Sequence, residues 1–218
     1  MSQHSPPDKV LVNRYLKGDQ TALGELLARH QNMLFNTVLR MVSNRDDAAE
    51  VTQDAMMRVV QNIDRFRQDS KFTTWATRIA MNCAISRLRR RKLRRMPSLD
   101  TPMGHDEDAG PMISRLAADE GLDPADRVAF NDRVELVHQA IELLDEPFRS
   151  VLVLRDINGM EYAQIAETLD IAKGTVKSRL FRARLAMREI VLEIESGERE
   201  LPGEETLEHQ NPPKTRNT

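Results

Sequence analysis

The stretch from Met160 to Met187 constrains the fold of this chain more than any other segment. Its sequence, MEYAQIAETLDIAKGTVKSRLFRARLAM, carries apolar residues at helical spacing on both sides of a short break at 170–173. The part after the break is rich in Lys and Arg. This pattern predicts two short helices around a tight turn, which is the layout of a helix-turn-helix whose second helix enters the DNA major groove.

Composition favours an all-α fold. Aromatic residues make up only 4% of the 218 residues and β-branched alternation is scarce, so long strands are not expected. The single cysteine, Cys83, excludes an internal disulfide and gives no cysteine-rich metal site. No segment resembles a signal peptide, and no apolar run approaches the length of a membrane span. We therefore expect a cytoplasmic protein with no membrane insertion, no metal and no other cofactor.

The charge is distributed unevenly along the chain. The net charge is only -2, but residues 71–95 hold nine basic residues and no acid, and residues 173–188 hold six more and again no acid. The compensating acids lie mainly in 100–123 and after residue 192. Two separate basic blocks predict two contacts with a polyanion rather than one.

Helical patterns and breaks divide the chain into four parts. Residues 8–96 and 124–194 are expected to form two small helical domains, the second beginning at the helix-start signal Asp123-Pro124. Residues 97–123, which are acidic and contain several Pro and Gly, are expected to form a flexible linker. The polar residues 195–218 are expected to form a disordered tail.

The second helix of the Met160–Met187 segment has two faces. Val176, Leu180 and Ala183 form an apolar stripe that must pack inward, and Gly174 or Thr175 is the expected N-cap. The opposite side carries the residues that we expect to read DNA, namely Lys177, Ser178, Phe181 and Arg182, while Arg179, Arg184 and Arg188 lie toward the flanks and suit phosphates.

Phe181 distinguishes this helix from a solvated basic helix at a domain surface, which is the alternative reading. A large aromatic side chain on a polar face is costly unless it has a partner, and a thymine methyl group could be that partner. The turn, the inward stripe and the outward Phe181 agree with one another. DNA binding is therefore the favoured interpretation.

The helix expected from about residue 46 begins with acids and carries no base on its first turns. Asp46 and Asp47 suit the positive end of the helix dipole. Glu50 and Asp54 are four residues apart, so they share a face without a basic partner at that spacing. Such a face suggests a protein partner with a basic surface, although a solvated acidic face is the simpler explanation.

The third long helix of the first domain is expected from about Phe72 into the basic run 89–95. Asn82 lies in a mostly apolar stretch of it, so it is either a buried amide with satisfied hydrogen bonds or a base contact beside a basic helix. The basic run should follow a phosphate backbone in either case.

Four blocks in order resemble the extracytoplasmic-function (ECF, group 4) sigma factors of bacterial RNA polymerase. They are KGDQTALGELLARHQ, DDAAEVTQDAMMRVVQNIDRFR, FTTWATRIAMNCAISRLRRRKLRR and IELLDEPFRSVLVLRDINGMEYAQIAETLDIAKGTVKSRLFRARLAM. The first three resemble the sigma-2 domain and the last resembles the sigma-4 domain. Together they cover most of the chain. One departure is that Leu144 is followed by Asp145, with the proline at Pro147, where the family often has Leu-Pro.

The resemblance implies a transcription initiation factor that directs core RNA polymerase to minus-10 and minus-35 promoter elements and assists promoter melting, in a stress or envelope response. The implied partners are promoter DNA, core polymerase through its beta-prime clamp helices and beta flap, and an anti-sigma factor. The implied polymerase-binding residues are Asp47, Glu50, Gln53 and Asp54. The implied minus-10 residues are Asp69, Ser70, Lys71, Phe72, Asn82, Arg89, Arg90 and Arg91, and the implied minus-35 residues are Thr175, Lys177, Ser178, Phe181 and Arg182.

Two other classes of protein were weighed. A stand-alone helix-turn-helix regulator would need a sensing or dimerising first domain, whereas the first domain here offers an acidic helix and a basic helix. An enzyme is disfavoured because the histidines are scattered, Cys83 stands alone and no phosphate-cradling glycine loop is present.

Overall fold

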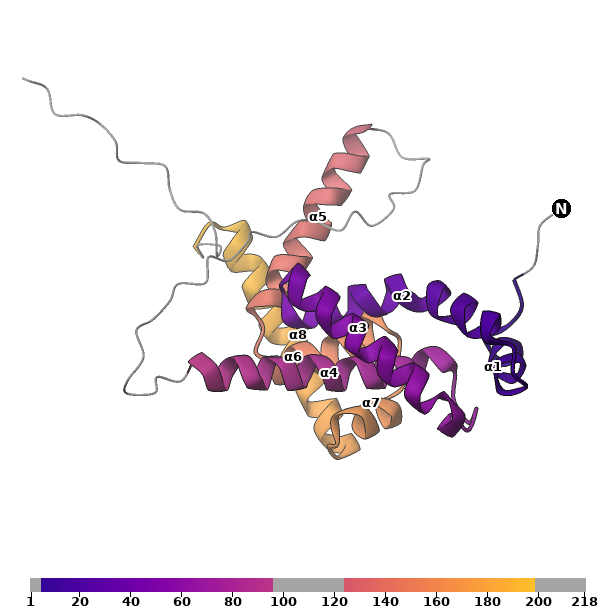
Figure 1. Cartoon of the computed structure of the whole chain (residues 1–218). Coiled ribbons are helices and arrows are strands. Elements are labelled where there is room, and N and C mark those ends of the chain that lie inside the picture. The colour runs from indigo at the N-terminus through magenta and orange to yellow at the C-terminus, as the bar shows by residue number, and fades with distance from the viewer. Residues whose placement is uncertain (1–4, 96–123, 199–218) are drawn as a thin grey trace, which may run out of the picture.

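The computed structural model describes residues 5–95 and 124–198, and every regular element within these ranges is helical (Figure 1). The all-α expectation is therefore confirmed for the described residues. The expected linker at 97–123 and residues 199–218 of the expected tail lie outside them. The first half of the chain comprises α1 (Asp8–Leu16), α2 (Gln20–Val42), α3 (Arg45–Asn62), the short 3₁₀ turn η1 (Ile63–Arg65) and α4 (Phe72–Arg95).

Local capping explains where α2 and α3 begin. The Oδ1 atom of Asp19 accepts a hydrogen bond from the backbone N–H of Thr21 at 3.1 Å, and Oδ1 of Asn44 accepts one from the N–H of Asp47 at 2.9 Å. Both satisfy donors that a helix leaves unpaired at its first turn. Between the two helices, Ser43 adopts a left-handed conformation with φ 58°, which ends α2 and reverses the chain into α3.

Three long helices build the first half. α2, α3 and α4 pack pairwise against one another, and α1 packs against α2. Their apolar faces supply a buried core that includes Leu26, Leu34, Met41, Val59 and Met81. This packing leaves one side of α3 and one side of α4 at the surface, where the predicted site residues of the first half lie.

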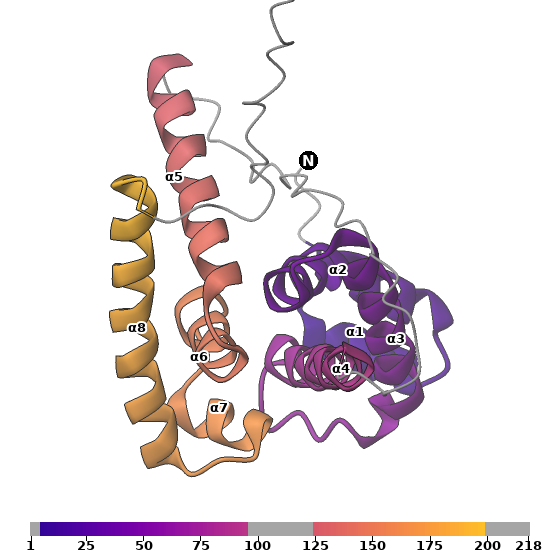
Figure 2. The ribbon, with the colours of Figure 1, turned by 90° about the vertical axis from the view of Figure 1, so that its left-hand side faces the viewer.

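The second half consists of α5 (Pro124–Leu143), α6 (Glu146–Leu152), the wider π-helical turn η2 (Val153–Ile157), α7 (Tyr162–Leu169) and α8 (Lys173–Glu195). The long helix α8 packs against α5, α6 and α7, and Figure 2 shows it running beside α5. Asp145 occupies the N-cap position of α6, but its side chain makes no capping hydrogen bond.

The helix-turn-helix forms as expected around residues 170–172, with a shifted start of its second helix. A capping box between Glu161 and Gln164 begins α7, and Asp170, with φ 53°, ends it. The predicted N-cap at Gly174 or Thr175 is wrong, because α8 begins at Lys173 with Ala172 as its N-cap. The N–H of Val176 donates to the carbonyl of Ala172 at 3.1 Å, which draws the intervening residues into the first helical turn.

The two halves lie against each other (Figure 2). Their buried residues form one continuous cluster, and α2 contacts α5, α6 and η2 while α4 contacts α7. Arg149 of α6 donates to the main-chain oxygens of Met41 and Leu144, at 2.8 and 2.9 Å. Arg78 of α4 forms an ion pair with Glu167 of α7. The chain therefore holds a closed arrangement that sequence patterns gave no reason to expect.

Candidate nucleic-acid and protein interfaces

The outward face of α8 carries most of the predicted minus-35 residues together. Lys177, Ser178 and Arg182 are exposed, and the Phe181 side chain is 67% exposed. Thr175 is half-buried, and its carbonyl accepts a hydrogen bond from the Ser178 hydroxyl at 3.1 Å. The inward stripe is as predicted, with Val176, Leu180 and Ala183 buried.

Arg184 departs from its predicted role as a free phosphate contact. Its guanidinium donates to both carboxylate oxygens of Asp156, at 3.0 Å from Nε and 2.6 Å from Nη2. The hydrogen bond to Asp156 raises the pKa of Arg184, because the carboxylate stabilises the positive charge. Asp156 lies in η2, 28 residues earlier, so helical spacing within α8 could not reveal the pair. Arg188 remains exposed on the same helix.

The loop before α4 presents three of its four predicted minus-10 residues to solvent. Asp69, Ser70 and Lys71 are exposed. Phe72 is only 3% exposed and belongs to an aromatic cluster with Phe66, Trp75 and His30, whose ring centroids lie 5.4 to 5.9 Å from that of Phe72. The structure therefore places Phe72 beneath the loop, as packing that supports it.

The exposed side of α4 carries Asn82 and the basic run. Asn82 is exposed, which excludes the buried-amide alternative. Arg89 and Arg90 are exposed and Arg91 is half-buried, so the predicted phosphate-facing residues lie at or near the surface. Arg87, just before them, is instead held by carboxylates of α3.

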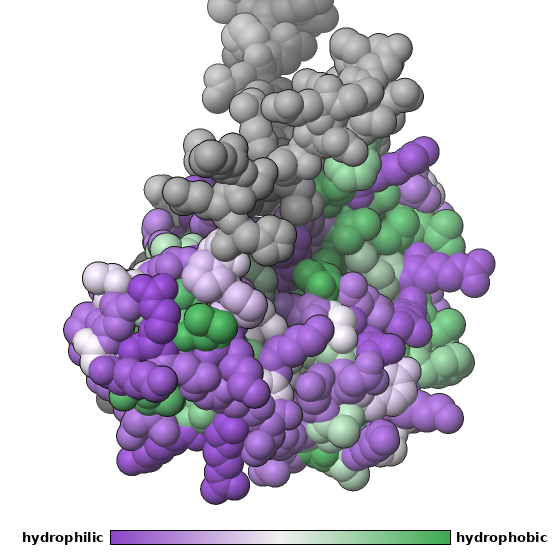
Figure 3. Space-filling view, turned by 90° about the vertical axis from the view of Figure 1, so that its right-hand side faces the viewer, coloured by the Kyte–Doolittle hydropathy of each residue, from purple (hydrophilic) through white to green (hydrophobic). Residues whose placement is uncertain are grey.

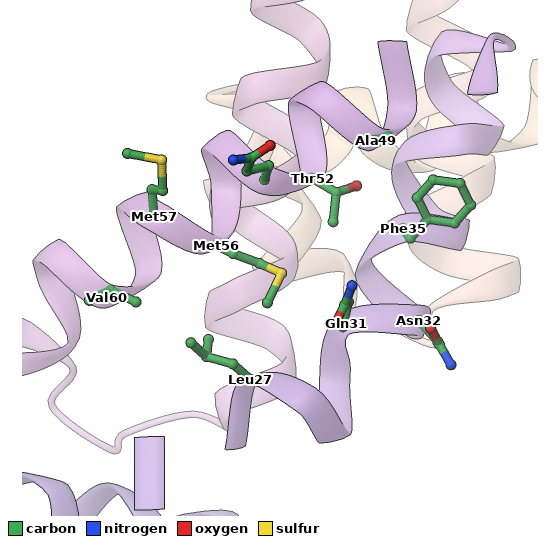
Figure 4. Close-up of a pocket in the computed structure, with 10 residues that line it drawn as sticks. Leu27, Gln31, Asn32, Phe35, Ala49, Thr52, Met56, Met57 and Val60 are labelled. Carbon is green, nitrogen blue, oxygen red and sulfur yellow. The ribbon is translucent and has the colours of Figure 1, made fainter. Parts of the chain in front are cut away.

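The surface of α3 combines acids with an apolar groove. Glu50, Gln53 and Asp54 are exposed and Asp47 is half-buried. Beside them, a groove of about 550 Å³ runs between α2 and α3, and the side chains of Leu27 and Met56 point toward each other across it (Figure 4). Its lining residues are Leu27, Gln31, Asn32, Phe35, Ala49, Thr52, Gln53, Met56, Met57 and Val60.

The groove is the feature that sequence reasoning missed. Met57 and Val60 are exposed although they are large and hydrophobic. They follow Gln53 at spacings of four and seven residues, so the acidic and apolar features share one side of α3. That spacing is the signal in the sequence that could have revealed the groove.

Hydrophilic side chains cover most of one visible face of the molecule, and hydrophobic ones gather in patches toward one side (Figure 3). Large exposed hydrophobic residues of α5 and α8 are Phe130, Val137, Phe181, Leu185 and Leu192.

Within residues 5–95 and 124–198, no cluster of three or more His, Cys, Asp or Glu could hold a metal ion. Over the same described ranges, no helix has the length and apolar character needed to span a membrane.

Comparison with known proteins matches both halves to one family. Residues 26–94 match Sigma-70 region 2, and residues 135–187 match Sigma-70, region 4. The chain is 35% identical over 181 residues to the RNA polymerase sigma-H factor of Pseudomonas aeruginosa, which covers 83% of this chain and 91% of that protein. It is 36% identical over 182 residues to the ECF RNA polymerase sigma-E factor of Escherichia coli K12, covering 83% and 92%.

Solved structures agree in fold. The sigma factor RpoE in complex with the anti-sigma factor NepR from Bartonella quintana matches with a TM-score of 0.60 at 22% identity, covering 78% of this chain and 96% of that one. CnrH in complex with the cytosolic domain of CnrY matches with a TM-score of 0.54 at 24% identity, covering 84% and 96%.

The helical fold and the matches together define a promoter-recognition factor of bacterial transcription. The chain belongs to the ECF sigma factors of RNA polymerase. It is a transcription initiation factor whose partners are core RNA polymerase and promoter DNA. The alternative of a stand-alone helix-turn-helix regulator is set aside, because the first half is itself a sigma region.

Proposed function

We propose that three surfaces of this sigma factor have different roles. α3 binds core polymerase, α4 with the preceding loop reads the minus-10 element, and α8 reads the minus-35 element. The observation that carries the proposal is the outward face of α8, where Phe181 stands 67% exposed among Lys177, Ser178 and Arg182. Leaving a phenylalanine in water is unfavourable by the hydrophobic effect, so its exposure favours a ligand with an apolar group among polar ones.

For the minus-35 element, a thymine methyl group suits Phe181, and guanine edges or phosphates suit Lys177 and Arg182. Ser178 can contact either a base edge or the backbone. Each well-placed base contact contributes about 1–3 kcal/mol of discrimination against the wrong base. Arg188, exposed on the same helix, is suited to phosphate.

For the minus-10 element, Asn82 and the loop residues Asp69, Ser70 and Lys71 would hold a base extruded from the non-template strand. Extrusion costs a few kcal/mol, which hydrogen bonds to the base edge can offset. The exposure of Asn82 and of the loop supports this role. Phe72 would act indirectly, by keeping the loop on its aromatic cluster.

For core polymerase, the groove and the acids together favour a partner helix with apolar side chains and flanking basic residues, as the beta-prime clamp helices would provide. Glu50 and Asp54 are exposed on α3, the helix that also supplies the groove residues Gln53, Met56 and Met57. Among the described residues, the buried hydroxyl of Thr52 lines this groove without a hydrogen-bond partner, so a bound helix could satisfy it. The exposed apolar residues Phe130 and Val137 of α5 and Leu192 of α8 would meet the beta flap.

Use of both promoter elements requires the two halves to separate. The element names place them about 25 base pairs apart, or about 85 Å at 3.4 Å per base pair. In the closed chain, α4 contacts α7, which packs on α8, and α8 itself, with 23 residues, is only about 35 Å long. Residues 96–123 join the halves and could span at most about 95 Å if fully extended. Separation on that tether is therefore sterically feasible.

The proposal includes no catalytic chemistry in this chain, which would act in the cytoplasm beside the polymerase. The relatives named ECF sigma-E factor, and the structure of RpoE bound to the anti-sigma factor NepR, support a role in a stress or envelope response under control of an anti-sigma protein.

Gel filtration of the full chain with core polymerase, followed by footprinting on promoters selected from transcripts induced by overexpression, tests the proposal. We expect co-elution with core and protection of both elements. Failure to co-elute, combined with tight duplex binding by the chain alone, would contradict it.

A further inference from the structure

Arg87 of α4 forms ion pairs with α3 in the first half of the chain. It lies on α4 between Asn82 and the basic run, yet its guanidinium points to α3. Nε donates to Oδ1 of Asp47 at 3.2 Å, Nη2 lies 2.9 Å from Oε2 of Glu50, and Nη1 donates to Oε1 of Glu50 at 3.3 Å. Two carboxylates of the helix assigned to polymerase binding therefore hold one arginine of the helix assigned to DNA.

This pairing makes Arg87 less available to a DNA phosphate than the other arginines of α4. The Arg87 side chain is only 29% exposed, whereas Arg89 and Arg90 are exposed. The hydrogen bond to Asp47 raises the pKa of Arg87, in keeping with a guanidinium stabilised by its carboxylate partners. A phosphate could bind Arg87 only by competing with both acids, so Arg87 does not fit the role of a backbone contact.

The two acids are not equivalent. The Asp47 side chain is 18% exposed, and the backbone N–H of Asp47 also donates to the N-cap residue Asn44 at 2.9 Å. The Glu50 side chain is 59% exposed and lies on the same side of α3 as Gln53 and Asp54. Asp47 is therefore placed to hold Arg87 inside the protein. Glu50 is exposed enough to contact a partner protein while it still pairs with Arg87.

The ion pairs of Arg87 add to a contact between α3 and α4, two helices whose buried residues include several small side chains. Ala48 and Ala55 of α3 and Ala80 and Ala84 of α4 are fully buried. Alanines let helices approach closely but offer few interlocking atoms, so they resist sliding weakly. A bidentate arginine has a fixed planar geometry and defines the position of one helix against the other more strictly.

We propose that Arg87 is a positioning residue that couples polymerase binding on α3 to base reading on α4. The proposal rests on the proposed function of these two helices. Asp47 anchors Arg87 and does not itself contact polymerase, whereas Glu50 is shared between Arg87 and a basic group of the polymerase. Binding of core polymerase to α3 thereby fixes the orientation of Asn82 and the residues around it on α4.

The test uses holoenzyme made with the full chain and with six variants. They are Arg87→Ala, Arg87→Lys, Asp47→Asn, Glu50→Gln, the double variant Arg87→Ala with Asp47→Asn, and the control Arg90→Ala. Stopped-flow fluorescence measures the rate of promoter opening at saturating holoenzyme, and promoter affinity is measured over a series of salt concentrations. Losing a partly exposed ion pair should slow opening by about fivefold in Arg87→Ala. Asp47→Asn should slow promoter opening to a similar extent, and Arg87→Lys should slow it less. The double variant, Arg87→Ala with Asp47→Asn, should slow opening no more than either single substitution does.

The salt series separates positioning from phosphate contact. Arg90→Ala should reduce the slope of log affinity against log salt by about one, whereas Arg87→Ala should leave that slope unchanged. Core affinity should fall in Glu50→Gln but stay within about twofold in Asp47→Asn, a margin well under 1 kcal/mol. Circular dichroism of each variant checks folding, and Asp47→Asn serves if Arg87→Ala does not fold.

Three results would overturn the proposal: an opening rate in Arg87→Ala and Asp47→Asn equal to that of the wild type, a loss of salt slope in Arg87→Ala equal to that in Arg90→Ala, or additive effects of the two substitutions. Failure of the proposed function would look different, because the wild-type chain itself would then not bind core polymerase.

Discussion

Nδ2 of Asn158, in the turn before α7, donates a hydrogen bond to Oγ1 of Thr37, 2.9 Å away on α2. Thr37 is buried, and its hydroxyl donates in turn to the carbonyl of Met33 at 2.9 Å. The boundary between the two halves thus contains a connected polar chain, where an unpaired group would cost about 1–3 kcal/mol. The closed arrangement is therefore held by specific partners as well as by apolar burial.

Replacing Arg149 should loosen this boundary. Arg149→Met leaves the carbonyls of Met41 and Leu144 without the donor that they share, which should lower the free energy of unfolding by about 1–3 kcal/mol and lengthen the distance between the halves. Chemical denaturation and the distance between spin labels on α2 and α5 measure the two effects. The control is Arg188→Met, at an exposed arginine of α8. An unchanged distance in Arg149→Met would show that apolar contacts alone keep the halves together.

Arg182 and Arg184 differ by two residues but should behave differently. Arg182→Ala should weaken recognition of an intact minus-35 element by about 1–3 kcal/mol. Arg184→Ala should affect sequence recognition less, because Asp156 already holds that guanidinium. In vitro transcription from promoters with intact and scrambled minus-35 elements measures both. Equal losses of Arg182→Ala on the two promoters would show that Arg182 does not read sequence.

Reversing the charge of the exposed acids on α3 should weaken the polymerase complex. Glu50→Lys with Asp54→Lys places two cations on the exposed surface of α3, where they would repel a basic partner, so core affinity should fall by at least tenfold, about 1.4 kcal/mol. Binding of the full chain to a minus-35 duplex should not change. Asp64→Lys, at an exposed site on η1, provides a control for a single charge reversal and is compared with Glu50→Lys alone. Core affinity equal to that of the wild type would remove this surface from the interface.

His138 should make stability depend on pH. Burial lowers its pKa from 6.5, the positive charge of Arg40 lowers it further, and Glu135 partly opposes the shift. Above pH 6.5 the imidazole is neutral in both the folded and the unfolded chain, so it adds no pH dependence. As pH falls below 6.5, the unfolded chain takes up the proton first and stability declines until the lowered pKa is passed.

Denaturant unfolding between pH 5 and 8 tests this expectation. His138→Gln should flatten the decline below pH 6.5 relative to the wild type, because glutamine takes up no proton. Parallel curves for the two proteins would assign the pH dependence to other groups.

The sequence anticipated the features that depend on local periodicity. The buried stripe of α8, with Val176 and Leu180, and the outward direction of Phe181 follow from a repeat of 3.6 residues within a single helix. The start of α8 was placed two or three residues late because Lys173 and Gly174 are weak boundary signals.

Features that join distant segments were not anticipated. Arg87 meets Asp47 across 40 residues of chain, and the closure of Arg149 on Met41 spans 108. No rule of residue spacing along the sequence predicts either pair. The minus-10 role of Phe72 is implied only by the resemblance to ECF sigma factors, and no pattern in the sequence indicates that this side chain is buried. Its burial depends on Phe66 and Trp75, whose positions only the folded chain fixes.

The ion pair between Arg78 and Glu167 has a further consequence for the charge of the promoter-facing surface. Arg78 lies one helical turn before Asn82, so it belongs to the same side of α4. While the halves touch, Glu167 neutralises this cation. If the halves part as proposed, Arg78 loses its carboxylate and becomes free for phosphate close to Asn82. Opening would then raise the affinity of α4 for DNA at the moment when α8 becomes free to reach the upstream element.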